Sequence, residues 1–258
     1  MRLRSVYGSP NNVGLYLGRA LPVAAAVTLL GGTRNRRLSY MGAVILMAIA
    51  LALSFSRGAL LLGVPAALTV IILCRGGNRA AATLLSLLAA ATAALVAFGH
   101  HPRLASLLSH TAGTTFFRLN LWHSTLNMIR DNPLTGVGLD NFLYAYRGRY
   151  IAPPAWQDPH LSHAHNWILD FAARIGLPGL AVMLWLLVAF FGTTARALRT
   201  LSEPGLRALA VGLVASMVDF LAHGMVDASY WFVDLAFAFM LTVALTQRLA
   251  NWHDPDLS

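Results

Sequence analysis

Three closely spaced histidines are the residues of this sequence best suited to acid–base chemistry. They lie in the stretch His160-Leu161-Ser162-His163-Ala164-His165, which Asn166 and Trp167 follow. Histidine is the one side chain whose unperturbed pKa lies near neutrality, so the stretch predicts a general base. A metal site is a weaker alternative, because the H-x-x-H-x-H spacing has no helical pattern and Asp158 is the nearest carboxylate. A solvated loop is the third interpretation.

Two arginines are candidates for binding phosphate. Arg57 lies in Ser56-Arg57-Gly58-Ala59, between two apolar runs with almost no loop. A charge at that depth in a membrane is a functional candidate, although an arginine reaching the outer headgroups is the alternative. Arg118 lies four residues before Trp122, on the same face of a predicted helix. Arginine pairs bidentately with phosphate oxygens, so the two could clamp a diphosphate. Arg118 alone is equally well explained as a solvated helix charge.

A polar pair interrupts an apolar run further along the chain. Asp219 and His223 are four residues apart, on one helical face, and Asp227 follows in the next turn. Buried between helices, this pair could orient an imidazole or relay protons. A polar pair buried for packing is the simpler interpretation.

The composition indicates that membrane-spanning helices position all of these residues. The chain has 258 residues, of which 57% are hydrophobic and 11% charged, whereas about 25% are charged in a soluble domain. Apolar runs of about 18 residues indicate spanning helices. We therefore predict an all-α polytopic membrane protein with about seven transmembrane helices. The runs are 13–30, 39–55, 58–74, 80–98, 177–194, 206–221 and 229–249.

Charge predicts the orientation of these helices. The net charge of +9 comes from arginine alone, and most arginines flank apolar runs. This distribution indicates topology and contact with membrane lipid rather than nucleic acid. If the arginine-rich loops are cytoplasmic, the segment at about 99–165 is a large external loop that contains short helices. Arg2 and Arg4 would then lie outside, so we expect a single membrane domain, 1–258, from the C-terminal portion of a longer protein. The single cysteine, Cys74, excludes an intramolecular disulfide.

The external segment has its own predicted elements. A helix is expected over 114–129, capped by Thr114 or Thr115 and ended by Asn132-Pro133. Its apolar face would contain Phe117, Leu121, Leu126 and Ile129. Gly136-Val137-Gly138 then predicts a turn. Finally, His165-Asn166 should open a short amphipathic helix that carries Asp170 and Arg174.

The order of these motifs resembles the O-antigen ligase and O-antigen polymerase superfamily of bacterial envelope glycosyltransferases. The resemblance covers nearly all of the chain, and its last spacing, nine residues from His165-Asn166 to Gly176, is similar to the ligase branch. The matching motifs are Ser9-Pro10-Asn11-Asn12, Ser56-Arg57-Gly58-Ala59, Arg118 with Trp122, Asn132-Pro133-Leu134-Thr135-Gly136-Val137-Gly138, Phe142, His165-Asn166 and Gly176-Leu177-Pro178-Gly179.

The resemblance implies an activity and roles for residues. The donor would be a glycan on undecaprenyl diphosphate, and the acceptor a glycan or lipid-linked glycan hydroxyl at the outer face of the bacterial inner membrane. His165 would be the general base, with His163 as its competitor, and Arg57 and Arg118 would stabilise the diphosphate. His163, Asn166 and Trp122 would contact substrate. No metal or other cofactor is implied. The alternatives are a polymerase of the same superfamily, a proton-coupled transporter and a non-catalytic fragment.

Overall fold

The protein is helical throughout the part that the structure describes. This computed structural model describes residues 3, 9–76, 78, 82–83, 113–156, 158–228 and 230–252. Every regular element among them is a helix, which confirms the predicted all-α class. Five helices are long and apolar enough to span a membrane, and Ala59–Arg75 is a shorter apolar helix. Nearly all of the predicted span 80–98, the segment 99–112, and Arg2 and Arg4 lie outside the described residues.

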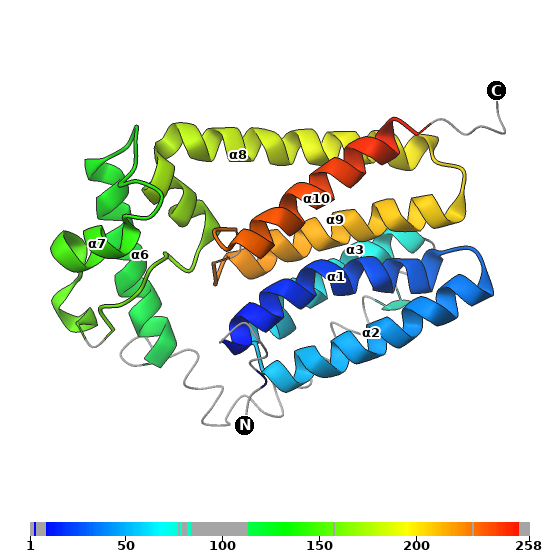
Figure 1. The fold of residues 1–258 in the computed structure, drawn as a ribbon, viewed down its shortest axis with the longest axis horizontal. Helices are drawn as coiled ribbons and strands as arrows, with labels where there is room; N and C mark the ends of the chain where they lie inside the picture. The colour runs from blue at the N-terminus through cyan, green and yellow to red at the C-terminus, as the bar shows by residue number, and fades with distance from the viewer. Residues whose placement is uncertain are drawn as a thin grey trace. The chain divides into compact units, whose positions relative to one another are not determined.

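The chain divides into two compact units, which we describe separately. Unit 1 comprises residues 1–80 and 185–258, and unit 2 comprises residues 81–184. The helices that belong wholly to unit 1 are α1 (Pro10–Leu30), α2 (Arg34–Ser54), η2 (Ala59–Gly63), α3 (Val64–Arg75), α9 (Pro204–Gly224) and α10 (Val233–Ala250) (Figure 1).

Polar residues set where the helices of unit 1 begin. Ser9 caps α1 by accepting a hydrogen bond from the Asn11 N–H, and Thr33 caps α2 through the Arg36 N–H. Glu203 caps α9 by accepting from the Leu206 N–H. Such caps satisfy backbone donors that have no partner inside the helix. The sequence therefore starts α1, α2 and α9 with a short polar side chain or a carboxylate at the end of a loop, whereas α10 begins after Phe232 without a side-chain cap.

Small residues bring α1 and α9 together in the core of unit 1. The two helices lie side by side (Figure 1). A Cβ at Gly212 would lie only 2.7 Å from the Cα of Val23, so the backbones approach too closely for a side chain. Close approach of this kind is how helices associate where lipid removes the hydrophobic driving force. The core around this contact contains Ala25, Ala26, Ala67, Ile71, Val211 and Ala215.

A π-helical turn follows the break between α2 and α3. Phe55 ends α2 in the left-handed conformation, with φ of 51°. The helix resumes through η2, where the Val64 N–H donates to the Ala59 carbonyl, five residues back. In an ordinary α-helix the N–H group bonds to the carbonyl four residues back, so this hydrogen-bonded turn of η2 contains one extra residue. Nothing in the sequence predicted this turn.

Unit 2 contains the predicted external helices. These are α6 (Gly113–Asp131), α7 (Phe142–Ala145), the π-helix η3 (Tyr146–Tyr150), the 3-10 turn η4 (Pro153–Ala155) and the first part of α8 (Trp167–Thr200). The bounds of α6 agree with the predicted helix within two residues. Its predicted apolar face was wrong at Leu126, which is 49% exposed, whereas Leu121 and Met128 are fully buried. The side chain of Thr114, one of the two predicted caps, lies outside the described part.

Helix α8 joins two elements that the sequence predicts separately. The expected amphipathic helix after Asn166 and the span 177–194 are continuous from Trp167 to Thr200. Gly176 is non-helical, with a φ of 74° and a ψ of 177°, and forms a kink between the two predicted elements.

Candidate active site

The backbone of Ala164, the residue between two of the histidines, is fixed by hydrogen bonds on both sides. The backbone N–H of Ala164 donates to Asp170 Oδ1 over 3.1 Å, and its carbonyl accepts from Trp122 Nε1 over 3.0 Å. Ala164 itself is fully buried. The flanking rings of His163 and His165 meet edge to face, with centroids 4.2 Å apart. The loop therefore carries two imidazoles on either side of one fixed residue, Ala164. The third histidine, His160, is exposed.

A buried ion pair holds the same loop. Arg174 Nε donates to Asp170 Oδ1 over 3.1 Å, and both side chains are buried. The two other nitrogens of Arg174 donate to the carbonyls of Leu139 and Ser162. The guanidinium also lies 5.5 Å from the ring centroid of Phe142. Breaking a buried ion pair is costly, because it leaves a buried charge without compensation, so Asp170 and Arg174 position the histidine loop rather than offering a charge to a substrate.

The start of α8 fixes the backbone immediately after His165. Asn166 Oδ1 accepts from the N–H groups of Ile168 and Leu169, both over 3.1 Å, which makes Asn166 the helix N-cap. A substrate contact from Asn166, as predicted, would have to use its amide nitrogen. His165 lies directly before this cap, with φ of 49°.

Backbone strain lies at one predicted catalytic residue, His165, and two residues before another, Arg57. Among the described residues, Phe55 and His165 are the two non-glycine residues with positive φ. Each such residue costs on the order of 1–3 kcal/mol, and persists where the surrounding structure fixes it, often at a functional site. His165 is the predicted base, and Phe55 stands two residues before Arg57. Each unit therefore has a strained residue at or near a predicted catalytic residue: His165 itself in unit 2, and Phe55 near Arg57 in unit 1.

Two glycine motifs, 40 residues apart in the sequence, interlock in unit 2. The kink at Gly176 leaves helix carbonyls without helical partners, and the turn at 133–138 supplies them. The Val137 and Gly138 N–H groups donate to the carbonyls of Ala173 and Arg174, and the Leu177 N–H donates to the Pro133 carbonyl. The turn predicted at Gly136-Val137-Gly138 is thus confirmed, and it holds the helix that carries Asp170.

Substituting Gly136 tests this interlock. Its φ is 65°, and a Cβ there would lie 2.5 Å from the Arg174 carbonyl carbon. Gly136→Ala should therefore destabilise the protein by about 1–3 kcal/mol from backbone strain alone, with more from the clash. Thermal unfolding in detergent measures the loss. Gly148→Ala is the control, because nothing lies within 4 Å of a Cβ there; equal unfolding temperatures for the two variants would contradict the interlock.

Arg118 and Trp122 share a face of α6. Trp122 carries the hydrogen bond to Ala164, and Arg118 lies one turn earlier with a partly exposed side chain. Residues four apart on a helix are neighbours, so Arg118 belongs to the face of α6 that contacts the histidine loop. The structure thus brings together the elements that carry Arg118, Trp122, His163 and His165 within unit 2.

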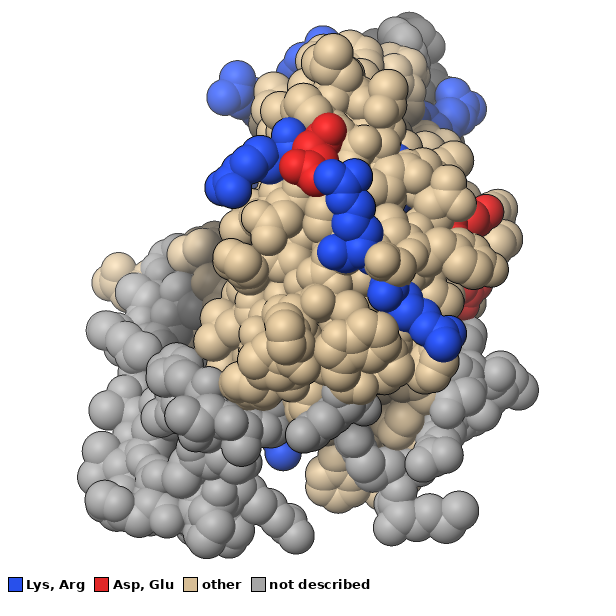
Figure 2. Space-filling view, turned by 90° about the vertical axis from the view of Figure 1, so that its left-hand side faces the viewer, with Lys and Arg blue, Asp and Glu red and all other residues tan. Residues whose placement is uncertain are grey.

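Other arginines of unit 2 are on its surface. Arg130, Arg147 and Arg149 are exposed, and Figure 2 shows arginine side chains in a band across one face with a few carboxylates beside them. Arg149 pairs with Asp131 over 2.9 Å, and the Tyr150 hydroxyl donates to the same carboxylate. Burial and this hydrogen bond raise the pKa of Tyr150. Arg149 is therefore largely neutralised by Asp131, which makes it a weaker phosphate-binding candidate than Arg118.

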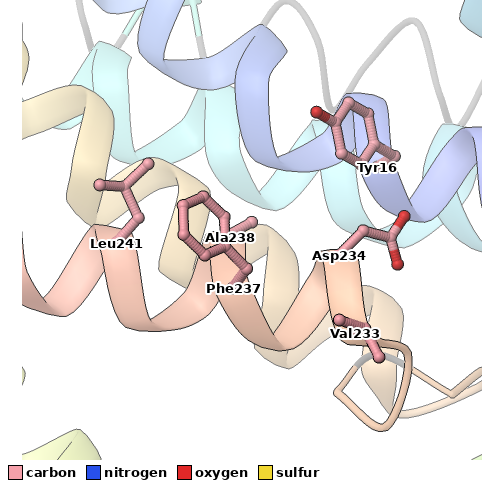
Figure 3. A pocket seen from close by; sticks show the side chains of 6 residues that line it. All are labelled: Tyr16, Val233, Asp234, Phe237, Ala238 and Leu241. Carbon is pink, nitrogen blue, oxygen red and sulfur yellow. The ribbon is translucent and has the colours of Figure 1, made fainter.

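Unit 1 has an apolar groove between α1 and α10, shown in Figure 3. Its volume is about 580 Å³, and its polar groups are the Tyr16 hydroxyl and the Asp234 carboxylate. No arginine is among its described lining residues, so the groove lacks a cation for a diphosphate. Its full lining is Tyr16, Val233, Asp234, Phe237, Ala238 and Leu241.

Comparison with known families identifies the family of this chain. A model of the O-antigen ligase family matches residues 42–184, which is more than half of the chain. The chain belongs to the O-antigen ligase family. No curated protein matches the chain. With its long apolar helices, this O-antigen ligase family member is a membrane protein and an enzyme of the ligase or polymerase type.

The matched region of this O-antigen ligase family member contains every predicted site residue. It includes the histidine loop, α6 and the break before η2. Arg57 lies in unit 1, where its side chain is exposed directly after the buried Ser56. Asp219 and His223 lie beyond the match. The positioning roles of Asp170 and Arg174 were missed, although their i, i+4 spacing at the start of a helix was a usable signal.

Proposed function

We propose that the protein transfers a glycan from undecaprenyl diphosphate to a hydroxyl group of an envelope acceptor. His165 is the general base, and Arg57 and Arg118 bind the diphosphate. His163, Asn166 and Trp122 contact the substrates. The single observation that carries this proposal is the pair of hydrogen bonds to the backbone N–H and carbonyl of Ala164, next to His165, whose backbone is in a strained conformation.

The proposed reaction balances in one displacement. His165 accepts the proton of the acceptor hydroxyl, whose oxygen forms a bond to the anomeric carbon of the glycan. The bond from that carbon to the diphosphate oxygen breaks, and undecaprenyl diphosphate leaves with the electron pair. Positioned cations stabilise the negative charge that develops on the leaving group. The proton on His165 is then released to solvent.

Arginine is suited to the role of the cation in this reaction. Its charge is permanent, and its planar fork matches two phosphate oxygens. Arg57 is exposed at the end of a span, and Arg118 is partly exposed on α6, so both side chains can reach a ligand. We expect chelators to leave transfer unchanged, because no step of the proposal uses a metal.

The partners are a lipid-linked glycan donor and a glycan or lipid-linked glycan acceptor, with membrane lipid around the spans. We place the protein in the bacterial inner membrane with its active site facing outward. The same chemistry serves a ligase, whose acceptor is a different molecule, and a polymerase, whose acceptor is another repeat unit. Transfer by the purified protein, with each acceptor in turn, tests the function and separates these two cases.

The outward orientation has its own test. Cysteines at Arg34 and Arg75 should be protected from an impermeant thiol reagent in intact cells, because arginine-rich loops stay in the cytoplasm. A cysteine at Gly148 should label, since that position is exposed and open. The background needs Cys74→Ser, because Cys74 is itself exposed. Labelling at 34 and 75 with protection at 148 would contradict an outward-facing site.

A further inference from the structure

A buried polar cluster in unit 1 is not used by the proposed reaction. Asp219 and His223, on α9, are 1% and 0% exposed, and Arg19 of α1 is buried as well. Arg19 attracts the Asp219 carboxylate, and its guanidinium lies 4.5 Å from the ring centroid of Phe220. Ionisable groups inside a membrane protein are costly to bury and are seldom kept for packing alone.

Glycines of the Arg57 segment lie directly against this cluster. A Cβ at Gly58 would lie 2.5 Å from His223 Cδ2 and 2.6 Å from His223 Nε2. A Cβ at Gly63 would overlap the Asp219 carboxylate, as would a Cβ at Gly18 of α1. The His223 ring and the Asp219 carboxylate therefore occupy the space of side chains that these glycines lack. Gly58 is the residue directly after Arg57.

The π-helix sets the register of this contact. Gly58 and Gly63 are five residues apart, and η2 bonds residues five apart, so both glycines face α9. Asp219 and His223 are four residues apart on an ordinary α-helix, which also puts them on one face. An α-helical turn in place of η2 would rotate one glycine away from its partner. The extra residue of η2 thus matches the two glycines to the two polar side chains.

We propose that Asp219 and His223 are positioning residues for Arg57. Their side chains pack against Gly58 and Gly63 and so fix the position of this segment along α9. The position and direction of the neighbouring Arg57 side chain are fixed as a result. The strained Phe55 and the fully buried Ser56 tie down the other side of the same residue. This inference rests on the proposed role of Arg57 in binding the donor diphosphate.

The test introduces a methyl group at the contact and then makes room for it. Initial rates of transfer from an undecaprenyl-diphosphate glycan are measured with the intact protein in membranes, at varied donor concentration. The variants are Gly58→Ala, His223→Ala and the double variant that carries both changes. Arg57→Lys is also made, both alone and together with Gly58→Ala. Gly42→Ala is the matched control, because nothing lies within 4 Å of a Cβ there.

Gly58→Ala should lower kcat/KM by about tenfold to a hundredfold, mostly through the donor KM, because small displacements of a binding group have effects of this size. Gly42→Ala should behave as the unmodified protein. His223→Ala alone should also lower kcat/KM, because its ring then no longer holds Gly58 in place. Adding His223→Ala to Gly58→Ala should restore part of the loss, because the new methyl group then occupies the space that the ring leaves; a folding defect unrelated to this contact would not be restored. With Arg57→Lys present, Gly58→Ala should add little, because the positioned group is already gone.

Three results would overturn the inference alone, provided that Arg57→Lys is itself impaired. These are Gly58→Ala matching Gly42→Ala, a double variant no better than Gly58→Ala, and additive losses from Gly58→Ala and Arg57→Lys. If Arg57→Lys transfers at the normal rate, the proposed function of Arg57 fails, and the positioning role fails with it. The single Arg57 variant therefore separates the two failures.

Discussion

Replacing His165 with alanine is expected to slow glycan transfer about 10²–10⁴-fold, the usual contribution of a general base. The acceptor hydroxyl would then have to lose its proton to water. Donor affinity should change little, because the proposed diphosphate contacts come from arginines. The measurement is the steady-state rate of transfer from an undecaprenyl-diphosphate glycan by equal amounts of protein in membranes, judged by immunoblot.

His163→Ala is the matched control for this variant. It removes the neighbouring ring, whose centroid is 4.2 Å away, and leaves the Ala164 hydrogen bonds to Asp170 and Trp122 in place. We expect a much smaller loss of rate, caused by the loss of the proposed substrate contact of His163 and by a less restrained His165 ring. Equal losses in both variants, together with inhibition by chelators, would contradict the general base and favour a metal site built from the histidines.

Arg57→Lys should lower kcat/KM about 10²–10³-fold, comparable to removing one donor from an oxyanion site. Charge is kept in this variant, but lysine cannot supply two parallel hydrogen bonds to a phosphate. The loss should appear with any acceptor, since Arg57 would contact the donor alone. Measuring kcat and the donor KM separately shows whether binding or the chemical step is affected.

Arg34→Lys is the control for Arg57→Lys. Arg34 is also exposed, at the start of α2, and no proposed step uses it. Its variant should transfer at the normal rate. If Arg57→Lys does the same, Arg57 is an anchor in the outer headgroups, and Arg118 is left as the only proposed cation for the diphosphate.

The helices were predictable wherever composition or a local stop signal determined them. The apolar runs gave the spans, and Asn132-Pro133 gave the end of α6. The apolar face of α6 was wrong at Leu126, because Phe142, Tyr146 and Ala164 pack against the side of the helix that carries Leu121 and Met128. Which side of a helix is covered depends on segments far away in the sequence, so helical periodicity alone could not identify it.

The candidate site was predictable as a set of residue types, but the contacts that fix it were not. His165 and Arg57 stand out by charge and context in an apolar chain. The pairing of the 133–138 turn with the Gly176 kink depends on backbone hydrogen bonds between residues 40 positions apart. The glycines at the two ends of η2 likewise lie against Asp219 and His223, which come from a helix far along the chain. That units 1 and 2 belong to one O-antigen ligase-like domain over 1–258 stays a prediction.

The most direct test of the proposed function is transfer by the purified protein in liposomes. The liposomes contain an undecaprenyl-diphosphate glycan and an acceptor glycan, with no nucleotide and with a chelator present. We expect glycan-linked acceptor and free undecaprenyl diphosphate to form in equal amounts, and His165→Ala protein to form neither at a comparable rate. The proposal that the protein is a glycosyltransferase would be contradicted if the donor stays intact with the unmodified protein. Proton-driven uptake of a solute without glycan transfer would also contradict it.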